Sequence, residues 1–322
     1  MELWEDRIMD KKTFALELQK RLQSMVGEDK TVELNTVVKT NIGEVMSINI
    51  RDSKSNTSPN FYLDGIYEKY KNGTCLSVLV ANIMDIYNEK KDTEFDASLF
   101  ESYEKVKDKV VFKIINKEMN KEFVSNGPHF DFLDLSMVFY IIVFNDGDGI
   151  GSVKVTNKLL DKWKITAEQL KTDAKANTPL LQPLKMCTLA NMITGIMNNN
   201  NPDNDDLSLE SDIGSMEGLN QIIVTNKGCI NGFGAIMYNN CLHDIAEKLG
   251  VEKLYIIPSS LHEAIVMPAG GNRIKADELQ KMVCEVNDSV VLKEEVLSDS
   301  VYLYDTITKR IGYAKKGEKT YV

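Results

Sequence analysis

The stretch Lys253–Pro268, which reads KLYIIPSSLHEAIVMP, holds the pattern that decides the fold. Two apolar runs rich in β-branched residues flank a short polar sequence, which is typical of two strands joined by a turn. Pro258 fixes φ at about −65°, and the hydroxyls of Ser259 and Ser260 can bond nearby backbone N–H groups. We therefore predict a strand pair around a polar turn, with His262 at the start of the second strand.

The neighbouring segments extend this pair into a larger sheet. The runs NQIIVTN and GFGAIMY are predicted as strands around Lys227 and Gly228, NCLHDIAEKLG as a helix that stops at Gly250, and ADELQKMVCEVNDSVV as a closing helix. LKMCTLANMITGIM, earlier in the chain, has helical spacing and is also predicted as a helix. Strands and helices in this order predict an α+β fold with largely antiparallel sheets and helices packed on one face.

The region from Val110 to Leu170 shows a similar order of elements. VVFKIINK, LDLSMVFYIIVF and SVKVTN are predicted strands, and KLLDKWKIT is a helical run. The pairs Asp146-Gly147 and Asp148-Gly149 resemble a calcium loop, but the twelfth position from Asp146 is Asn157 instead of a bidentate glutamate, so we predict a hairpin turn. SVKVTNKLLDKWKIT is similar to GAIMYNNCLHDIAEKLGV, and a degenerate internal duplication would explain this single similarity, which is weak evidence by itself.

The first hundred residues form a separate pattern. An amphipathic helix at 11–26 precedes two strands joined at Asn41-Ile42-Gly43, and a pair of helices follows with Gly73 between them and Thr74 as the N-cap of the second. We expect two domains, an N-terminal α+β domain at 1–108 and a C-terminal α+β domain at 109–308. The polar and acidic segment 198–218 is expected to be an exposed loop, and 309–322 a basic, solvated tail.

Composition narrows the class of protein. The chain has 322 residues, 43% of them hydrophobic, and a formal net charge of −10, so a general nucleic-acid binder is disfavoured because phosphate backbones would be repelled. Five widely spaced cysteines without a C-x-x-C pair fit neither a disulfide framework nor a zinc ribbon. No apolar run reaches the ~18 residues of a membrane span, and the start lacks a signal pattern, so we expect a soluble cytoplasmic protein.

The polar turn could also be a catalytic site. His262 lies beside Glu263 and close to the Ser260 hydroxyl, and histidine titrates near neutral pH, so it could act as a general base. A zincin motif would need a second histidine at 266, where the chain has Val266, and no G-x-S-x-G surrounds the serines. We interpret the segment as a structural turn and keep catalysis as the alternative.

A second histidine also has acidic neighbours. His129 is followed by Asp131 and Asp134 in NGPHFDFLDLS, and these carboxylates could orient the imidazole or share a metal with it. Strand alternation turns residues 129 and 131 to one face and 134 to the other, so no complete ligand set is predicted. We predict no metal and no cofactor. The glycines of PAGGNR at 268–273 could meet an anion, but we interpret them as a turn.

Several blocks together resemble a known family. NFYLDGIYEKYKNG, GPHFDFLDLSMVFYIIV, NTPLLQP, YIIPSSLHEAIVMPA and EEVLSDSVYLYD are similar to an uncharacterised bacterial family of about 300 residues, which is known only as a domain of unknown function and is common in anaerobic gut bacteria. The similarity runs from about residue 10 to 305, and it implies a cytosolic bacterial protein without assigning an activity.

Two functions of different classes follow. The first is a non-enzymatic binding or regulatory protein that acts through a protein or small-ligand partner, which fits the acidic charge and the lack of a cofactor motif. The second is a hydrolase or metal-assisted enzyme that uses His262 and Glu263 with His129 and Asp131. The second requires these groups to converge on one pocket.

Overall fold

The computed structural model describes residues 8–52, 58–90, 97–145, 150–191, 221–270 and 274–314. The chain forms two compact units, Met1–Glu101 and Ser102–Val322. The expected hairpin turn at 146–149, the expected loop at 198–218, the end of the PAGGNR turn and the tail from 315 onward lie outside the described residues.

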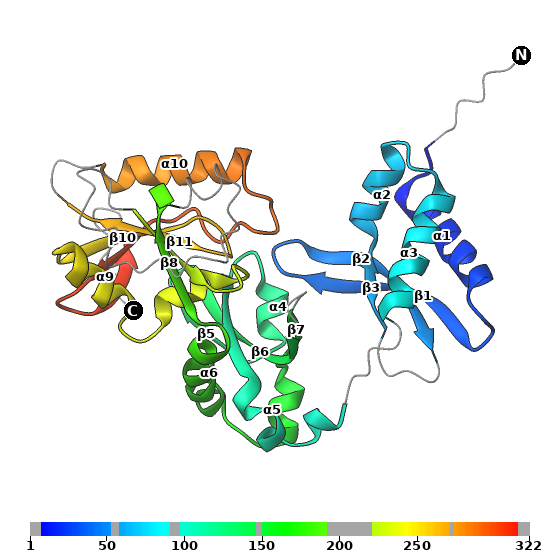
Figure 1. The fold of residues 1–322 in the computed structure, drawn as a ribbon, viewed down its shortest axis with the longest axis horizontal. Coiled ribbons are helices and arrows are strands. Elements are labelled where there is room, and N and C mark those ends of the chain that lie inside the picture. Colours follow the sequence, from blue (N-terminus) through cyan, green and yellow to red (C-terminus); the bar gives the residue numbers. More distant parts are fainter. Residues whose placement is uncertain are drawn as a thin grey trace, which may run out of the picture. The chain divides into compact units, whose positions relative to one another are not determined.

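Unit 1 packs helices against one face of a small antiparallel sheet with the strand order β1-β2-β3 (Figure 1). Its elements are α1 (Lys11–Met25), β1 (Lys30–Lys39), β2 (Gly43–Asp52), β3 (Asn60–Tyr62), α2 (Leu63–Lys71), α3 (Leu76–Lys90) and the 3-10 helix η1 (Ala97–Glu101). Val32 and Ile50 lie opposite each other in the sheet and belong to one apolar cluster with Phe14 of α1 and Ile83 of α3. The helices therefore bury the apolar side of a sheet that could not exclude water alone.

The ends of these elements follow from single residues. The Asp10 carboxylate accepts hydrogen bonds from the backbone N–H groups of Lys12 and Thr13 and so caps α1. Asn41 and Gly43 both have positive φ, which confirms the turn expected between β1 and β2. The expected N-cap at Thr74 is wrong by one residue, because α3 begins at Leu76 and the backbone N–H groups of Val78 and Leu79 donate to the Cys75 carbonyl.

Unit 2 holds two antiparallel sheets, and the α+β class expected from the sequence is confirmed. The first sheet has the order β4-β6-β5, with β7 also paired to β6; the second has the order β13-β12-β10-β11-β9-β8. The strands are β4 (Val110–Asn116), β5 (His129–Phe132), β6 (Leu135–Asn145), β7 (Ile150–Lys154), β8 (Leu184–Thr188), β9 (Ile222–Asn226), β10 (Lys253–Pro258), β11 (Ala264–Pro268), β12 (Tyr302–Asp305) and β13 (Arg310–Tyr313).

Helices connect and cover these sheets. They are η2 (Tyr103–Lys105), η3 (Lys107–Lys109), α4 (Lys121–Ser125), α5 (Asn157–Trp163), α6 (Ala167–Leu181), η4 (Gly232–Met237), α9 (Cys241–Leu249) and α10 (Ala276–Ser289). α6 is fixed to β4 where the Thr178 hydroxyl accepts the backbone N–H of Phe112 at 3.0 Å. α10 buries Leu279 and Val283 against Met267 of β11, and it lies along that sheet in Figure 1.

η4 joins the two sheets of unit 2. A Cβ atom added at Gly234 would lie 3.1 Å from the Phe112 ring of β4, so the backbone of η4 packs directly on the first sheet. The backbone N–H of Phe233 donates to the Leu261 carbonyl in the turn after β10, which ties the same helix to the second sheet. The small residues of GFGAIM therefore allow both sheets to approach one short helix.

The secondary structure of three segments differs from what the sequence predicts. Residues 184–188 form β8, because pairing with β9 stabilises an extended chain there instead of the expected helix. The expected strand GFGAIMY is the helix η4, which follows a residue in the left-handed region, Asn231. Residues Arg310–Tyr313 of the expected solvated tail form β13, paired with β12. The internal duplication and the domain boundary near 108 stay predictions.

Candidate functional site

The segment between β10 and β11 is the polar turn that the sequence predicts. The backbone N–H groups of Ser259 and Ser260 both point to the Glu263 carbonyl, at 3.2 and 3.4 Å. The Ser260 hydroxyl accepts the backbone N–H of His262 at 3.0 Å, which is the local bond expected of a serine in a turn. β11 begins only at Ala264, so the expectation that His262 starts the strand is wrong.

The His262 side chain is engaged on both ring nitrogens. Its Nδ1 accepts the backbone N–H of Asn231 at 3.1 Å, and its Nε2 lies 3.6 Å from a carboxylate oxygen of Glu295. An Nδ1 that accepts a hydrogen bond requires the proton on Nε2 in the neutral ring. The carboxylate beside the ring is therefore Glu295, which the sequence does not indicate, whereas Glu263 accepts from the Ser259 hydroxyl at 3.2 Å.

His129 and Asp131 lie on β5, in the other sheet of unit 2. Both are exposed on the same face of the strand, as strand alternation predicts. The Nδ1 of His129 lies 2.9 Å from the Gly127 carbonyl, and Asp131 is 4.0 Å from the Lys117 amino group. Among the residues described, no group of three or more His, Cys, Asp or Glu is arranged to hold a metal ion. The joint use of His129 and His262 therefore stays a hypothesis with no contact to support it.

Asp134 is instead the centre of a dense polar cluster. It follows Leu133, whose φ is +54°, in the turn between β5 and β6. Its carboxylate accepts hydrogen bonds from Ser298 at 2.5 Å, Tyr302 at 2.8 Å, Ser300 at 3.3 Å and Tyr313 at 3.4 Å. Burial, followed by the nearby Asp134 charge, raises the pKa of Tyr302 well above its ordinary value. This cluster fastens the β5–β6 turn to the last two strands of the other sheet.

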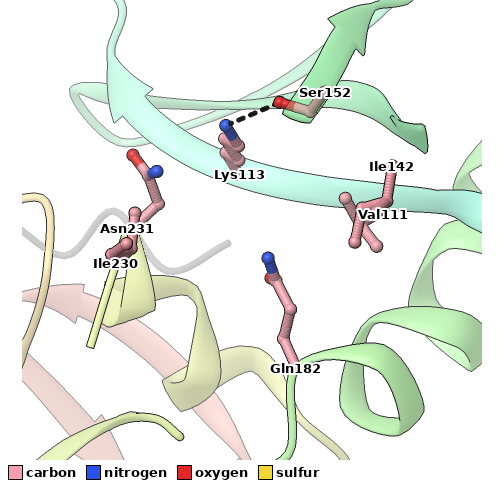
Figure 2. A pocket seen from close by; sticks show the side chains of 7 residues that line it. All are labelled: Val111, Lys113, Ile142, Ser152, Gln182, Ile230 and Asn231. Atoms are coloured by element: carbon pink, nitrogen blue, oxygen red, sulfur yellow. Dashed lines mark hydrogen bonds between the residues drawn. The ribbon is translucent and has the colours of Figure 1, made fainter. Parts of the chain in front are cut away.

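A small pocket opens beside β4, and Lys113 lines it (Figure 2). The neighbouring side chains of β4, from Val110 to Ile115, are apolar and buried, so Lys113 is the exception in this strand. The pocket has a volume of about 80 Å³, well above the ~15 Å³ that one water molecule needs. Its lining residues are Val111, Lys113, Ile142, Ser152, Gln182, Ile230 and Asn231.

The Lys113 amino group has few polar partners. Its Nζ lies 3.5 Å from the Ser152 hydroxyl, at the outer limit of a hydrogen bond, and 3.9 Å from the centre of the Tyr140 ring. In the part of the chain that the structure describes, no carboxylate lies within 4.0 Å of it. Burial lowers the pKa of Lys113 to about 8, because a cation loses solvation there without gaining an anion.

The far side of the pocket is formed by Gln182, Ile230 and Asn231. Gln182 follows α6, and its backbone carbonyl accepts a hydrogen bond from the Tyr238 hydroxyl at 2.8 Å. Figure 2 shows its amide directed into the space between β4 and the loop of Ile230 and Asn231. A pocket with an ammonium group and two amides on an apolar background is the usual composition of a small-ligand site.

The loop that carries Ile230 and Asn231 is held by local hydrogen bonds. Cys229 and Asn231 both have φ near +50°, a left-handed conformation that few non-glycine residues adopt. The Asn226 side chain stabilises it by bonding the carbonyl of Ile230 at 2.8 Å and its N–H at 3.3 Å. The bond from the Asn231 N–H to His262 then links the polar turn to the pocket, so His262 positions the rim of the pocket.

Sequence reasoning missed the pocket, although one signal for it was present. A lysine in the middle of the apolar strand VVFKIIN breaks the pattern of a buried strand, where charged residues are rare unless they have a partner. Gln182 and Asn231 could not be found in this way, because they reach the pocket from loops distant in sequence.

Comparison with known proteins identifies a family for this chain. A family model described as a family of unknown function, DUF5688, covers residues 11–306, close to the range that the sequence blocks indicate. No curated protein and no solved structure matches the chain significantly. Within the described ranges, none of the helices has the length and apolar character required to cross a membrane. The chain belongs to the family of unknown function DUF5688.

Proposed function

We propose that this protein is a ligand-binding protein that holds a small carboxylate in the Lys113 pocket. The observation that carries the proposal is the Lys113 amino group, which lines the pocket and whose partners among the described residues are a distant hydroxyl and a ring face. A half-buried cation of this kind is stabilised by an anion that enters its site.

The lining favours an organic acid over an inorganic ion. The amides of Gln182 and Asn231 can donate to carboxylate oxygens, while Val111, Ile142 and Ile230 offer apolar contact for a short hydrocarbon part. The volume of about 80 Å³ suits a molecule of a few heavy atoms. The proposed ligand is therefore a short-chain carboxylic acid.

The contacts of His262 support binding over hydrolysis. A general base needs a free acceptor nitrogen near the proton that it removes. The Nδ1 of His262 already accepts the Asn231 N–H, and the Nε2 faces Glu295. In our proposal His262 therefore has a supporting role, because it holds the loop that forms one wall of the ligand pocket.

Calorimetric titration with acetate tests the proposal. We expect wild-type protein to bind acetate and Lys113→Met to bind it at least about tenfold more weakly, since each 1.4 kcal/mol of lost interaction is a factor of ten. Lys158→Met is the matched control, because Lys158 is exposed on α5. Equal binding by Lys113→Met and wild type, or no binding of acetate or its short homologues, would overturn the proposal.

A further inference from the structure

We propose that Lys113 forms an imine with small oxo-acids, so that the pocket captures carbonyl compounds covalently. The proposal rests on the carboxylate site proposed above and adds a reaction to it. It stands on the position of the Lys113 amine inside a partly enclosed pocket, on the amides that face it, and on the lack of a carboxylate partner within the described chain.

The protonation state of the amine favours this reaction. Imine formation needs a neutral amine, and burial lowers the pKa of Lys113 to about 8. At pH 7 roughly one Lys113 in ten would be neutral, against fewer than about one in a thousand for an ordinary lysine. Surface lysines should therefore react much more slowly than Lys113.

The groups around the amine suit the two ends of an oxo-acid. The Gln182 and Asn231 amides line the pocket with Lys113 and can hold the carboxylate, which leaves the carbonyl carbon to the amine. The Ser152 hydroxyl lies 3.5 Å from Nζ, so it can transfer a proton between the nitrogen and the carbonyl oxygen as the imine forms. Val111 and Ile142 limit the space to short acids.

The reaction balances without an oxidant or a reductant. The Nζ lone pair attacks the carbonyl carbon and forms a C–N bond, and the carbonyl oxygen takes a proton that leaves the nitrogen. The hydroxyl group then departs as water with the second nitrogen proton, and a C=N bond remains. One amine and one carbonyl compound thus give one imine and one water.

Trapping with glyoxylate and cyanoborohydride tests the inference on the full-length protein. Cyanoborohydride delivers hydride to the imine carbon and leaves a stable secondary amine, which peptide mass mapping locates. We expect a single adduct at Lys113, a rate that rises about tenfold from pH 6 to pH 7 because the neutral fraction grows, and competition by acetate. Lys113→Arg should lose the adduct, and Ser152→Ala should form it several-fold more slowly.

The outcomes separate this inference from the proposed function. If acetate binds in the calorimetric titration but glyoxylate leaves no adduct on Lys113, the imine is overturned and the carboxylate site stands. If neither molecule binds, both proposals fail. Adducts spread over exposed lysines such as Lys158, at rates equal to that of Lys113, would also overturn the imine.

Discussion

Two charged side chains of unit 2, Asp134 and Lys113, have opposite surroundings. The Asp134 carboxylate accepts four hydroxyl groups from the segment that runs from Ser298 to Tyr313. The Lys113 amine meets one hydroxyl at 3.5 Å and one ring face. A charged group with several polar partners stabilises the fold, whereas the few partners of Lys113 are the reason that we propose a ligand there.

The largest expected effect on stability comes from removing the charge of Asp134, whose carboxylate accepts four hydroxyl groups. Asp134→Asn keeps the size of the side chain but places an NH₂ group against hydroxyls that now donate to the carboxylate. We expect a loss of about 3 kcal/mol in the free energy of unfolding, because hydrogen bonds to a charged group are strong and an unmatched buried donor adds its own cost. Urea unfolding, followed by Trp163 fluorescence in a Trp4→Phe background, measures it.

The control for this change, Asp131, lies three residues before Asp134 in the sequence. Asp131→Asn alters an exposed carboxylate whose Lys117 partner is 4.0 Å away, and the change should be within about 0.5 kcal/mol. If both variants unfold alike, Asp134 is not the structural centre that its contacts indicate.

Removing the charge of Lys113 should have the opposite effect and raise the stability of the free protein. Lys113→Met keeps the apolar stem and removes the buried charge, so it should stabilise the free protein by on the order of 2 kcal/mol at pH 7. Above about pH 8 the native lysine loses its proton while the unfolded one, with an ordinary pKa of 10.5, keeps it. Wild-type stability therefore rises with pH relative to the variant in this window, and the gap should close toward pH 10.5.

Unfolding of both proteins at pH 7, 8.5 and 10 measures this gap. Burial also lowers the pKa of Lys154 to about 8, but Lys154 is present in both proteins and cancels from the difference. A gap that stays constant with pH would mean that Lys113 does not carry a cost of buried charge.

A smaller effect is expected when Lys113 is given a charged partner, as Asp134 has its hydroxyl partners. Ser152→Asp places a carboxylate close to Lys113, which raises the pKa of the amine by about one unit or more and supplies the missing anion. Acetate affinity and the rate of glyoxylate trapping should each fall about tenfold, while stability changes by about 1 kcal/mol or less. Ser152→Asn is the uncharged control and should keep most of the affinity. Unchanged acetate affinity in Ser152→Asp would contradict the role given to the charge of Lys113.

The smallest effects belong to the polar turn. Ser259→Ala combined with Ser260→Ala removes hydroxyls that bond Glu263 and the His262 backbone, and should cost about 1–2 kcal/mol without changing acetate affinity. His262→Ala should likewise act mainly through stability, with a modest loss of affinity because Asn231 loses its acceptor. Paired melting and titration measurements check both. If His262→Ala kept its melting temperature and lost all function, the catalytic interpretation of this histidine would be correct.

More of the fold than of the candidate site could be predicted from the sequence. Strand pairs with local turns, such as β10 and β11, follow from alternation and turn residues. β8 was missed because LKMCTLAN fits helical spacing equally well, and its partner β9 lies more than thirty residues further on. The contact between Glu295 and His262 likewise depends on tertiary packing, which no local pattern encodes.

The order of strands in the larger sheet of unit 2 determines which edge strands another copy of the protein could pair with. Within the described chain this sheet ends at β8 and β13, strands of five and four residues. Each carries a basic side chain, Lys185 or Arg310. Long, flat and uncharged edges template aggregation by adding strands from other molecules. Two copies that approach through the same edge would bring like charges together over a short ladder, so this sheet disfavours its own polymerisation.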